Sequence, residues 1–324
     1  MTLTLPKAEL HLHLEGAITP DLVRRFATRN KIDILDGLFD KNDHYVWSDF
    51  PQFLDSFDRA SNVIRTTQDY TDLTRHYLVE QAKIGAVYVE LFCSPSHAEM
   101  QGLSFEDHLL AVAAGIDQAF AQTGIIGRII MTCVRHLGPD RAVDVARKTV
   151  DCGHPHVVGF GMGGNESLYT QKDFYPAYKI AADAGLGCTT HAGEVLGPQS
   201  VWDAIDHLPV DRIGHGVRAI EDAKLVDELV KRGIVLEVCP GSNIALSVYP
   251  DYASHPLRKL YDAGVKVTLG SDDPPFFHTT LADEYQRAHD TFGFSTDELR
   301  GITKTAIEAA YVDSETKALL WSRI

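Results

Sequence analysis

The sequence contains few cysteines, and their spacing suggests no pair. There are 5 in 324 residues, and no two of them form a C-x-x-C motif. An odd number of scattered cysteines argues against a disulfide framework. We therefore expect core thiols in a protein of the reducing cytoplasm, at Cys93, Cys133, Cys152, Cys188 and Cys239.

Basic residues are also scarce relative to acidic ones. Lys and Arg number 30 against 45 Asp and Glu, which gives a formal charge of -15. A surface that binds nucleic acid or an anionic membrane needs a basic patch, and none is visible. No stretch approaches the roughly 18 apolar residues of a membrane span, and the N-terminus lacks a charged segment followed by an apolar one. These absences predict a soluble cytoplasmic protein that binds neither nucleic acid nor membrane.

Low-complexity runs and obvious linkers are lacking as well. The chain has no repeat beyond an alternation of apolar runs and helical patterns, and hydrophobic residues make up 44% of it. Barrels of alternating strands and helices commonly run to this length as one unit. We therefore expect one domain over residues 1–324.

Eight short apolar runs predict β-strands, and helical patterns separate most of them. This alternation predicts a (β/α)8 or TIM barrel. A doubly wound open sheet has the same alternation and is the alternative fold. The predicted strands are Ala8–His13, Val87–Phe92, Gly127–Cys133, Val157–Gly161, Gly187–His191, Arg212–His215, Ile234–Val238 and Val265–Gly270.

Several predicted helices have start signals that support this division. Ser104 followed by Asp107 resembles a capping box ahead of an apolar stripe at helical spacing. Pro139 fits the first turn of another helix, and Ser295 opens an acidic segment typical of a helix N-terminus. The intervals between the strands are therefore predicted to be helical.

Histidines and an aspartate lie at the ends of several predicted strands. His11 and His13 lie on the first strand, where side chains two residues apart share a face. His191 and His215 end the fifth and sixth predicted strands, and Asp272 follows the eighth. The carboxyl ends of barrel strands meet at one mouth, so these side chains should converge there. Imidazoles with a carboxylate suit Zn²⁺ with a position open for water, and we predict such a site.

Two more carboxylates accompany the predicted metal ligands. Glu194 follows His191 by three residues, and a carboxyl whose pKa is raised by burial can deliver a proton to a substrate. Asp273 directly follows Asp272 and should point elsewhere; a turn or cap role before the next proline is the alternative. The fourth predicted strand has no lysine that could bridge two metals, which favours one metal per chain.

Six groups of residues occur in an order found in one known family. They are Pro6–Gly16, Tyr88–Glu90 with Ser94-Pro95, His191–Glu194, Arg212–Gly216, Leu236–Pro240 with Ser242-Asn243, and Ser271–Pro274. H-x-H alone is a weak signal, but the ordered set covers residues 6 to about 284. The chain resembles the adenosine/adenine deaminase family of amidohydrolase barrels.

The resemblance implies a metal-dependent loss of ammonia from C6 of a 6-aminopurine. Glu194 would protonate N1 of the purine, and His215 would act beside the metal as base and electrostatic partner. The one Zn²⁺ per chain would be held by His11, His13, His191 and Asp272.

The resemblance also implies which residues bind the purine. Asp273 would hydrogen-bond N7, and the backbone N–H of Gly164 would meet N3. His13 and Glu15 complete this substrate-binding set. A simple turn after a strand is the alternative interpretation of the glycine-rich stretch around Gly164.

The residues that bear on the choice of substrate point in two directions. Glu15 stands where adenosine deaminases usually have Asp, and its surroundings resemble adenine deaminases. Gly214, the motif Tyr88–Glu90 and Ser94-Pro95 instead favour a nucleoside. We therefore expect adenosine and deoxyadenosine as substrates, which would yield inosine or its deoxy form and ammonia. Free adenine is the alternative, followed by other 6-amino nucleosides such as aminodeoxyfutalosine.

Two other classes of protein share parts of this pattern. A non-catalytic purine-binding barrel would not need Glu194, and a single-metal hydrolase of cyclic amides or esters would not need Glu194 and Asp273 together. Both therefore fit less well than a deaminase. The sequence gives no indication of the oligomeric state.

A segment between the first two predicted strands carries aromatic residues. Phe50, Phe53, Leu54 and Phe57 fall at helical spacing, and the resemblance implies an apolar lid over the purine within residues 30–65. An ordinary helix that packs on the barrel explains the same spacing.

Overall fold

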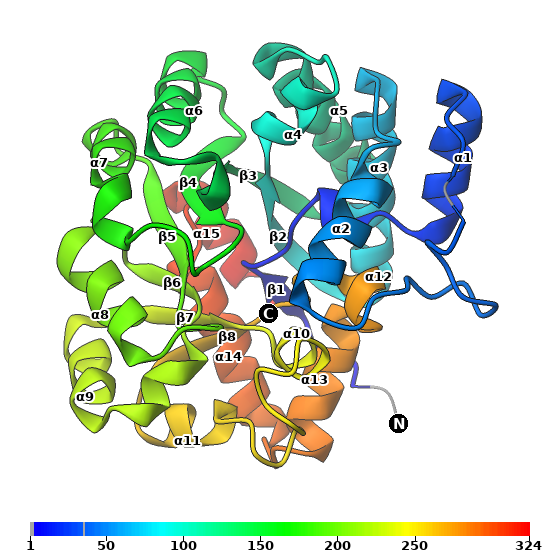
Figure 1. Cartoon of the computed structure of the whole chain (residues 1–324). Coiled ribbons are helices and arrows are strands. Elements are labelled where there is room, and N and C mark those ends of the chain that lie inside the picture. Colours follow the sequence, from blue (N-terminus) through cyan, green and yellow to red (C-terminus); the bar gives the residue numbers. More distant parts are fainter. Residues whose placement is uncertain (1–2, 35) are drawn as a thin grey trace.

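The computed structural model describes residues 3–34 and 36–324, and its centre is a ring of parallel strands (Figure 1). The strands are hydrogen-bonded in chain order from the first to the eighth. A doubly wound sheet would reverse its order at a switch point, so the barrel prediction is confirmed. The strands are β1 (Lys7–Glu9), β2 (Ala86–Cys93), β3 (Ile126–Val134), β4 (Val157–Gly163), β5 (Gly187–Ala192), β6 (Arg212–His215), β7 (Val235–Val238) and β8 (Lys266–Leu269).

Helices surround the strands (Figure 1). Those in the described part of the chain are α1 (Pro20–Asn30), α2 (Phe50–Ser61), α3 (Thr67–Lys83), α4 (Pro95–Met100), α5 (Phe105–Thr123), α6 (Pro139–Cys152), α7 (Tyr175–Asp183), α8 (Pro198–His207), α9 (Ala223–Arg232), α10 (Pro240–Ala245), α11 (Leu257–Asp262), α12 (Pro274–Phe277), α13 (Leu281–Asp290), α14 (Thr296–Ala309) and α15 (Ser314–Trp321). Short 3-10 turns are η1 (Glu15–Ala17), η2 (Arg135–Leu137), η3 (Gln171–Phe174) and η4 (Val217–Glu221). Among the described residues, no helix is both long and apolar enough to cross a membrane.

The predicted helix starts are confirmed. The Ser104 hydroxyl accepts from the Asp107 N–H at 3.0 Å at the start of α5, and Pro139 is the first residue of α6. Ser295 and Glu298 form a complete capping box at the start of α14. Each such cap satisfies backbone N–H groups that the helix leaves free and typically contributes about 1 kcal/mol.

The first strand ends earlier than its apolar run predicts. Regular pairing stops at Glu9 instead of continuing to His13, because the next residues pair on two sides. The His13 N–H donates to the carbonyl of Asp272 at 3.0 Å, and the Asp272 N–H donates to the carbonyl of His11 at 3.2 Å. His13 also forms a bridge with Phe92 on β2. This segment thus links β2 to the residues after β8 and closes the barrel.

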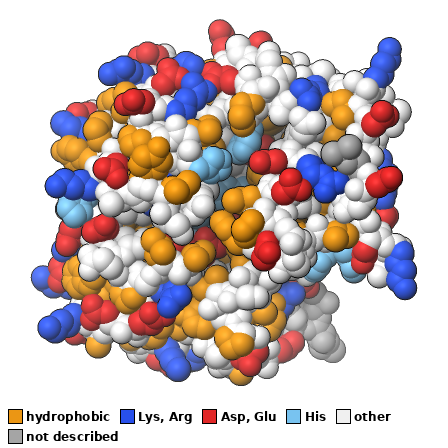
Figure 2. Space-filling model, in the orientation of Figure 1, with side chains coloured by type: hydrophobic (Ala, Val, Ile, Leu, Met, Phe, Trp, Pro, Cys, Tyr) orange, Lys and Arg blue, Asp and Glu red, His pale blue; other side chains and the backbone are white. Residues whose placement is uncertain are grey.

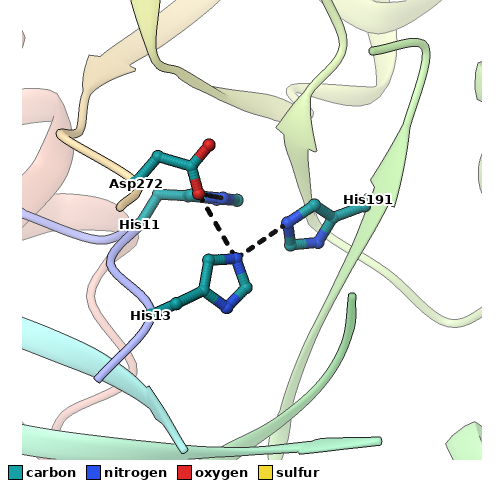
Figure 3. Close-up of side chains that lie close together, drawn as sticks. All are labelled: His11, His13, His191 and Asp272. Atoms are coloured by element: carbon teal, nitrogen blue, oxygen red, sulfur yellow. Dashed lines mark hydrogen bonds and ion pairs between the residues drawn. The ribbon is translucent and has the colours of Figure 1, made fainter. Parts of the chain in front are cut away.

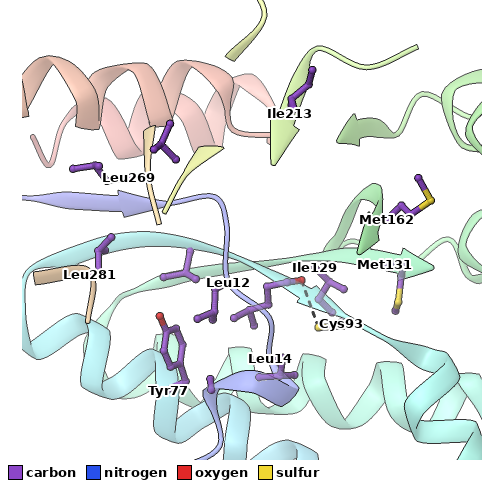
Figure 4. Packing of buried hydrophobic residues seen from close by; sticks show 14 of the residues in the cluster. Leu12, Leu14, Tyr77, Cys93, Ile129, Met131, Met162, Ile213, Leu269 and Leu281 are labelled. Carbon is purple, nitrogen blue, oxygen red and sulfur yellow. Dashed lines mark hydrogen bonds between the residues drawn. The ribbon is translucent and has the colours of Figure 1, made fainter. Parts of the chain in front are cut away.

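Alternation along this segment separates core residues from site residues. Leu12 and Leu14 are fully buried in the hydrophobic cluster of which Figure 4 shows a part, together with Tyr77 of α3. The intervening His11 and His13 have ring centroids 5.4 Å apart. Successive side chains of an extended segment point to opposite faces. The buried leucines therefore place the two histidines on the other face, at the mouth of the barrel.

The predicted lid segment contains the end of α1, a loop and α2; residue 35 of the range 30–65 lies outside the described residues. The ring of Phe53 on α2 lies 5.0 Å from that of Phe277 on α12, centroid to centroid. In the loop, Tyr45 stacks on Phe276 at 3.8 Å. The segment is therefore joined to the barrel through aromatic contacts with α12.

Candidate active site

Three histidines and one aspartate converge at the carboxyl end of the barrel (Figure 3). The Nε2 atoms of His13 and His191 lie 3.1 Å apart. Asp272 Oδ1 lies 3.4 Å from Nε2 of His13 and 3.6 Å from Nε2 of His11. One donor atom from each of the four lies within 4.8 Å of all the others. Ligands about 2 Å from a common ion have separations of this order, so the group fits a divalent metal.

Hydrogen bonds determine which ring nitrogen of two histidines faces the group. His11 Nδ1 lies 2.8 Å from Glu237 Oε2, and His191 Nδ1 lies 2.7 Å from the carbonyl oxygen of Met162. With Nδ1 engaged as donor, Nε2 of each ring offers a lone pair. His11 Nε2 is buried and has no hydrogen-bond partner among the described residues. A buried acceptor of this kind suits a metal ligand.

Glu237 supports His11 and is itself held by basic and polar groups. Its Oε1 lies 2.7 Å from Arg212 Nε and accepts from the Thr189 hydroxyl at 3.1 Å. Burial opposes the charge on Glu237, but the guanidinium of Arg212 and the ring of His11 outweigh it and lower the pKa of this carboxyl. An ionised Glu237 keeps the His11 proton on Nδ1 and leaves Nε2 free for the metal.

Glu194 and His215 lie next to the metal-binding group. His215 Nε2 is 3.7 Å from Glu194 Oε1 and 3.8 Å from Asp272 Oδ2. Burial, together with the charges of Asp272 and Glu166, raises the pKa of Glu194 well above its usual value. Burial lowers the pKa of His215 to about 3. These shifts favour the protonated form of the Glu194 carboxyl and the neutral form of the His215 imidazole, a pair suited to proton transfer.

Asp273 lines the same cavity as Asp272. Its side chain makes no capping hydrogen bond at the start of α12, which argues against the alternative that Asp273 serves only as a helix cap. Its Oδ1 is buried without a partner among the described residues. Burial and the neighbouring carboxylates of Asp272 and Glu194 raise the pKa of Asp273. A Cβ at Gly16 would lie 1.6 Å from Asp273 Oδ1, so glycine at this position makes room for the carboxyl.

Gly164 and Glu15 also line the cavity. Gly164 follows β4 with φ of 100°, a conformation that favours glycine. Glu15 is buried and accepts from the Ser94 N–H at 3.3 Å, and burial raises its pKa to about 7. All residues predicted to bind metal or substrate therefore meet in one place.

The cavity has a volume of about 230 Å³. This is below the roughly 300–1,000 Å³ of sites for drug-sized ligands and indicates a small ligand. Metal-binding residues and the carboxyls of Glu15, Glu194 and Asp273 line part of the cavity, and an apolar wall comes mainly from α2. Figure 2 shows a hollow near the centre of this face, with histidine and hydrophobic side chains at its edge. The wall residues are Phe50, Phe53, Leu54, Phe57 and Phe277.

Sequence reasoning missed a buried carboxylate that supports the loop after β8. Glu9 Oε1 accepts from the N–H of Ser271 at 2.8 Å and from its hydroxyl at 2.6 Å. Tyr77 donates to the other oxygen at 2.6 Å. Glu9 therefore fixes the residue immediately before Asp272. A charged residue at the start of an otherwise apolar strand was the available signal.

The barrel and the site together define a metal-dependent hydrolase of the amidohydrolase type. Residues 6–324 match the family model described as adenosine deaminase. The chain therefore belongs to the adenosine deaminase family, and it is an enzyme that hydrolyses C–N bonds and deaminates an aminopurine. The family predicted from the sequence motifs is confirmed.

Three similar proteins give this assignment more detail. An adenine deaminase from Rhizobium leguminosarum bv. trifolii is 50% identical over 324 residues, which cover 100% of both chains. The crystal structure of adenine deaminase from Arthrobacter aurescens has a TM-score of 0.92 and 31% identity, over 98% of this chain and 97% of that chain. An amidohydrolase from Burkholderia ambifaria with bound Zn has a TM-score of 0.89 and 28% identity, over 98% and 89%.

The relatives named adenine deaminase favour free adenine over the adenosine that the sequence motifs predict. In the structure, two of the motif residues that favour a nucleoside have packing or pairing roles of their own. A Cβ at Gly214 would lie 2.7 Å from His11 Cε1, so this glycine is needed for close packing on a metal-binding histidine. In the motif Tyr88–Glu90, Glu90 Oε2 accepts from Arg212 at 2.5 Å in the buried interior. Neither feature requires a ribose.

Proposed function

We propose that this protein is an adenine deaminase, which converts adenine and water to hypoxanthine and ammonia. The observation that carries the proposal is that two buried carboxyls, Glu194 and Asp273, line the cavity that contains the metal-binding group, where burial and neighbouring charges raise the pKa of each. A purine needs proton donors at its ring nitrogens if it is to be attacked at C6. Full-length relatives named adenine deaminase support the free base as substrate.

The four ligands His11, His13, His191 and Asp272 would hold one Zn²⁺ per chain. The bound metal would supply a nucleophile from water near neutral pH, since coordination lowers the pKa of water toward about 7. The set of three imidazoles and one carboxylate suits zinc, and the Burkholderia neighbour contains this ion.

The other residues would orient the base and move protons. Glu194 would give its proton to N1, which reduces the aromatic stabilisation of the ring and makes C6 more electrophilic. His215 would accept a proton from the attacking water. Asp273 would donate from its protonated carboxyl to N7, which carries a lone pair, while the Gly164 N–H would donate to N3.

Glu15 provides a reason for preferring the base to the nucleoside. It is a buried carboxyl in the cavity wall, and one oxygen already accepts from the Ser94 N–H. Adenine has an additional N–H at N9, which a carboxylate would accept and which a nucleoside lacks. A buried polar group left unpaired by the wrong substrate costs binding energy, so this contact would select the base.

The helix α2 would act as the lid over the bound base. Its Phe50, Leu54 and Phe57 line the cavity, and a flat aromatic ligand would pack against this wall. Closure would exclude water other than the reacting one.

The experiment that tests this function compares kcat/KM for adenine, adenosine, deoxyadenosine and aminodeoxyfutalosine under identical conditions. We expect adenine to exceed each nucleoside by at least about 10²-fold, since a site built for the N9–H rejects ligands without it. Adenosine turnover at a higher kcat/KM than adenine would reject the assignment to the base and return the function to a nucleoside deaminase.

A further inference from the structure

Glu166, a residue with no role so far in the reaction, is attached to the turn that carries Glu194. It follows β4, which neighbours β5 in the barrel (Figure 1), and it is 2% exposed. Its carboxylate accepts four hydrogen bonds, all from the turn after β5 or from the first turn of α8. The donors are Gly193 N at 2.6 Å, Ser200 Oγ at 2.5 Å, Val195 N at 2.7 Å and Leu196 N at 2.9 Å.

These bonds clamp the backbone on both sides of Glu194. The N–H of Gly193 precedes Glu194 and the N–H of Val195 follows it, and both end on the same carboxylate. The side chains of Val195 and Leu196 are each 39% exposed, so packing anchors them only in part. Glu194 itself is 6% exposed. A surface turn must therefore hold a buried acid in place, and Glu166 supplies the acceptors that restrain it.

The four hydrogen bonds that Glu166 accepts require a carboxylate at this position. An ionised carboxylate only accepts hydrogen bonds, which matches three backbone N–H donors and a hydroxyl. A glutamine at position 166 would turn one of its two oxygens into an NH₂ group, which would face N–H donors less than 3 Å away. The turn would have to move to relieve this conflict.

We propose that Glu166 is a positioning residue for deamination: it holds the turn at Gly193–Leu196 so that the Glu194 carboxyl points at the purine. This inference rests on the proposed role of Glu194 as proton donor. Misplacing a reacting group by about 1 Å can cost about 10²-fold in rate. Glu166 therefore acts on the chemical step through Glu194, without touching substrate or metal-binding residues.

The first test is Glu166→Gln in the full chain. We expect kcat for adenine to fall by about 10²-fold, while the metal content by elemental analysis and the Kd for hypoxanthine stay at wild-type values. A kcat within twofold of wild type would overturn the inference. So would a loss of metal or of hypoxanthine binding in parallel with kcat, since that would indicate general damage to the site.

Asp69→Asn is the matched control. Asp69 is also fully buried and accepts backbone N–H bonds, from Arg65 at 3.1 Å and Thr66 at 2.9 Å, but it caps α3 on the outside of the barrel. This variant should lose stability and keep kcat. If Glu166→Gln shows no cooperative unfolding transition, Glu166→Asp replaces it, because the shorter side chain keeps the charge but cannot reach all four donors.

A double-mutant cycle separates this inference from the proposed function. Affinity for a 6-hydroxy-dihydropurine analogue should fall in Glu166→Gln and in Glu194→Gln, and adding Glu166→Gln to Glu194→Gln should cause no further loss. If the two losses multiply instead, Glu166 does not act through Glu194 and the inference is wrong. If Glu194→Gln keeps the wild-type kcat, the proposed role of Glu194 as proton donor is wrong, whatever the result for Glu166→Gln. If Glu194→Gln is inactive and Glu166→Gln is normal, only the positioning role fails.

Discussion

Replacing Glu194 by glutamine is expected to lower kcat for adenine by about 10²–10⁴-fold, the range typical of general acid–base catalysis. Glutamine keeps the size of the side chain and its ability to hydrogen-bond, but it has no acidic proton to give to N1. Burial and the nearby carboxylates raise the pKa of Glu194, which favours the protonated form that this role requires. The purine should still bind, because the walls of the cavity are unchanged.

Binding measurements separate this loss of catalysis from a loss of binding. Affinity for a 6-hydroxy-dihydropurine analogue should fall much more than affinity for hypoxanthine, since only a species resembling the transition state uses the proton at N1. Asp69→Asn again serves as the control for removing a buried carboxylate. Near-normal kcat of Glu194→Gln on every 6-aminopurine would show that N1 protonation by Glu194 is wrong.

His11→Ala and Asp272→Ala are each expected to remove metal and activity together. Each substitution deletes one of four donors that lie within 4.8 Å of one another, and the remaining three form an incomplete site. Elemental analysis of wild type should give one ion per chain, and the two variants should give almost none. His215→Ala should keep most of the metal and lose activity, because His215 stands beside the four-donor group next to Glu194.

Three outcomes of the metal measurements would contradict the proposed metal site. Two tightly bound ions per wild-type chain would overturn the single-metal site. A His215→Ala protein without metal would show that His215 is a ligand. Full metal content in His11→Ala would show that the ion is held elsewhere.

The barrel and the convergence of its polar residues could be predicted because both depend on local pattern. Strands buried on both faces leave apolar runs in the sequence, and each of the eight runs overlaps a strand in the structure. Polar residues such as His191 and His215 come at the ends of these runs, and the geometry of a barrel brings such ends together. The motifs then added chemistry that no single residue indicates.

The supports of the site could not be predicted, since they join residues that are far apart in the chain. Glu9 and Ser271 are separated by 262 positions, and Glu237 reaches His11 across 226. Nothing local shows which backbone N–H a buried carboxylate accepts from. The early end of β1 has a similar origin, because it depends on the approach of Asp272 from the other end of the chain.

The residues that bear on the choice of substrate show how the meaning of a local motif depends on its surroundings in the fold. As sequence motifs, Gly214 and Glu90 favour a nucleoside substrate; in the structure one makes room for the His11 ring and the other pairs with a buried arginine. Each residue therefore has a structural role that involves no substrate. Glu15, which lines the cavity, is the residue on which the proposed preference for adenine rests.

The most direct test of the central claim is the reaction of the metal-loaded protein with adenine in isotopically labelled water, followed by mass spectrometry and ammonia determination. Hydrolytic deamination predicts that adenine is converted to hypoxanthine with one labelled oxygen and one ammonia per molecule. The reaction should stop when a chelator removes the metal and return when Zn²⁺ is restored. Adenine that remains unchanged under conditions in which the protein is folded and metal-loaded would contradict the account.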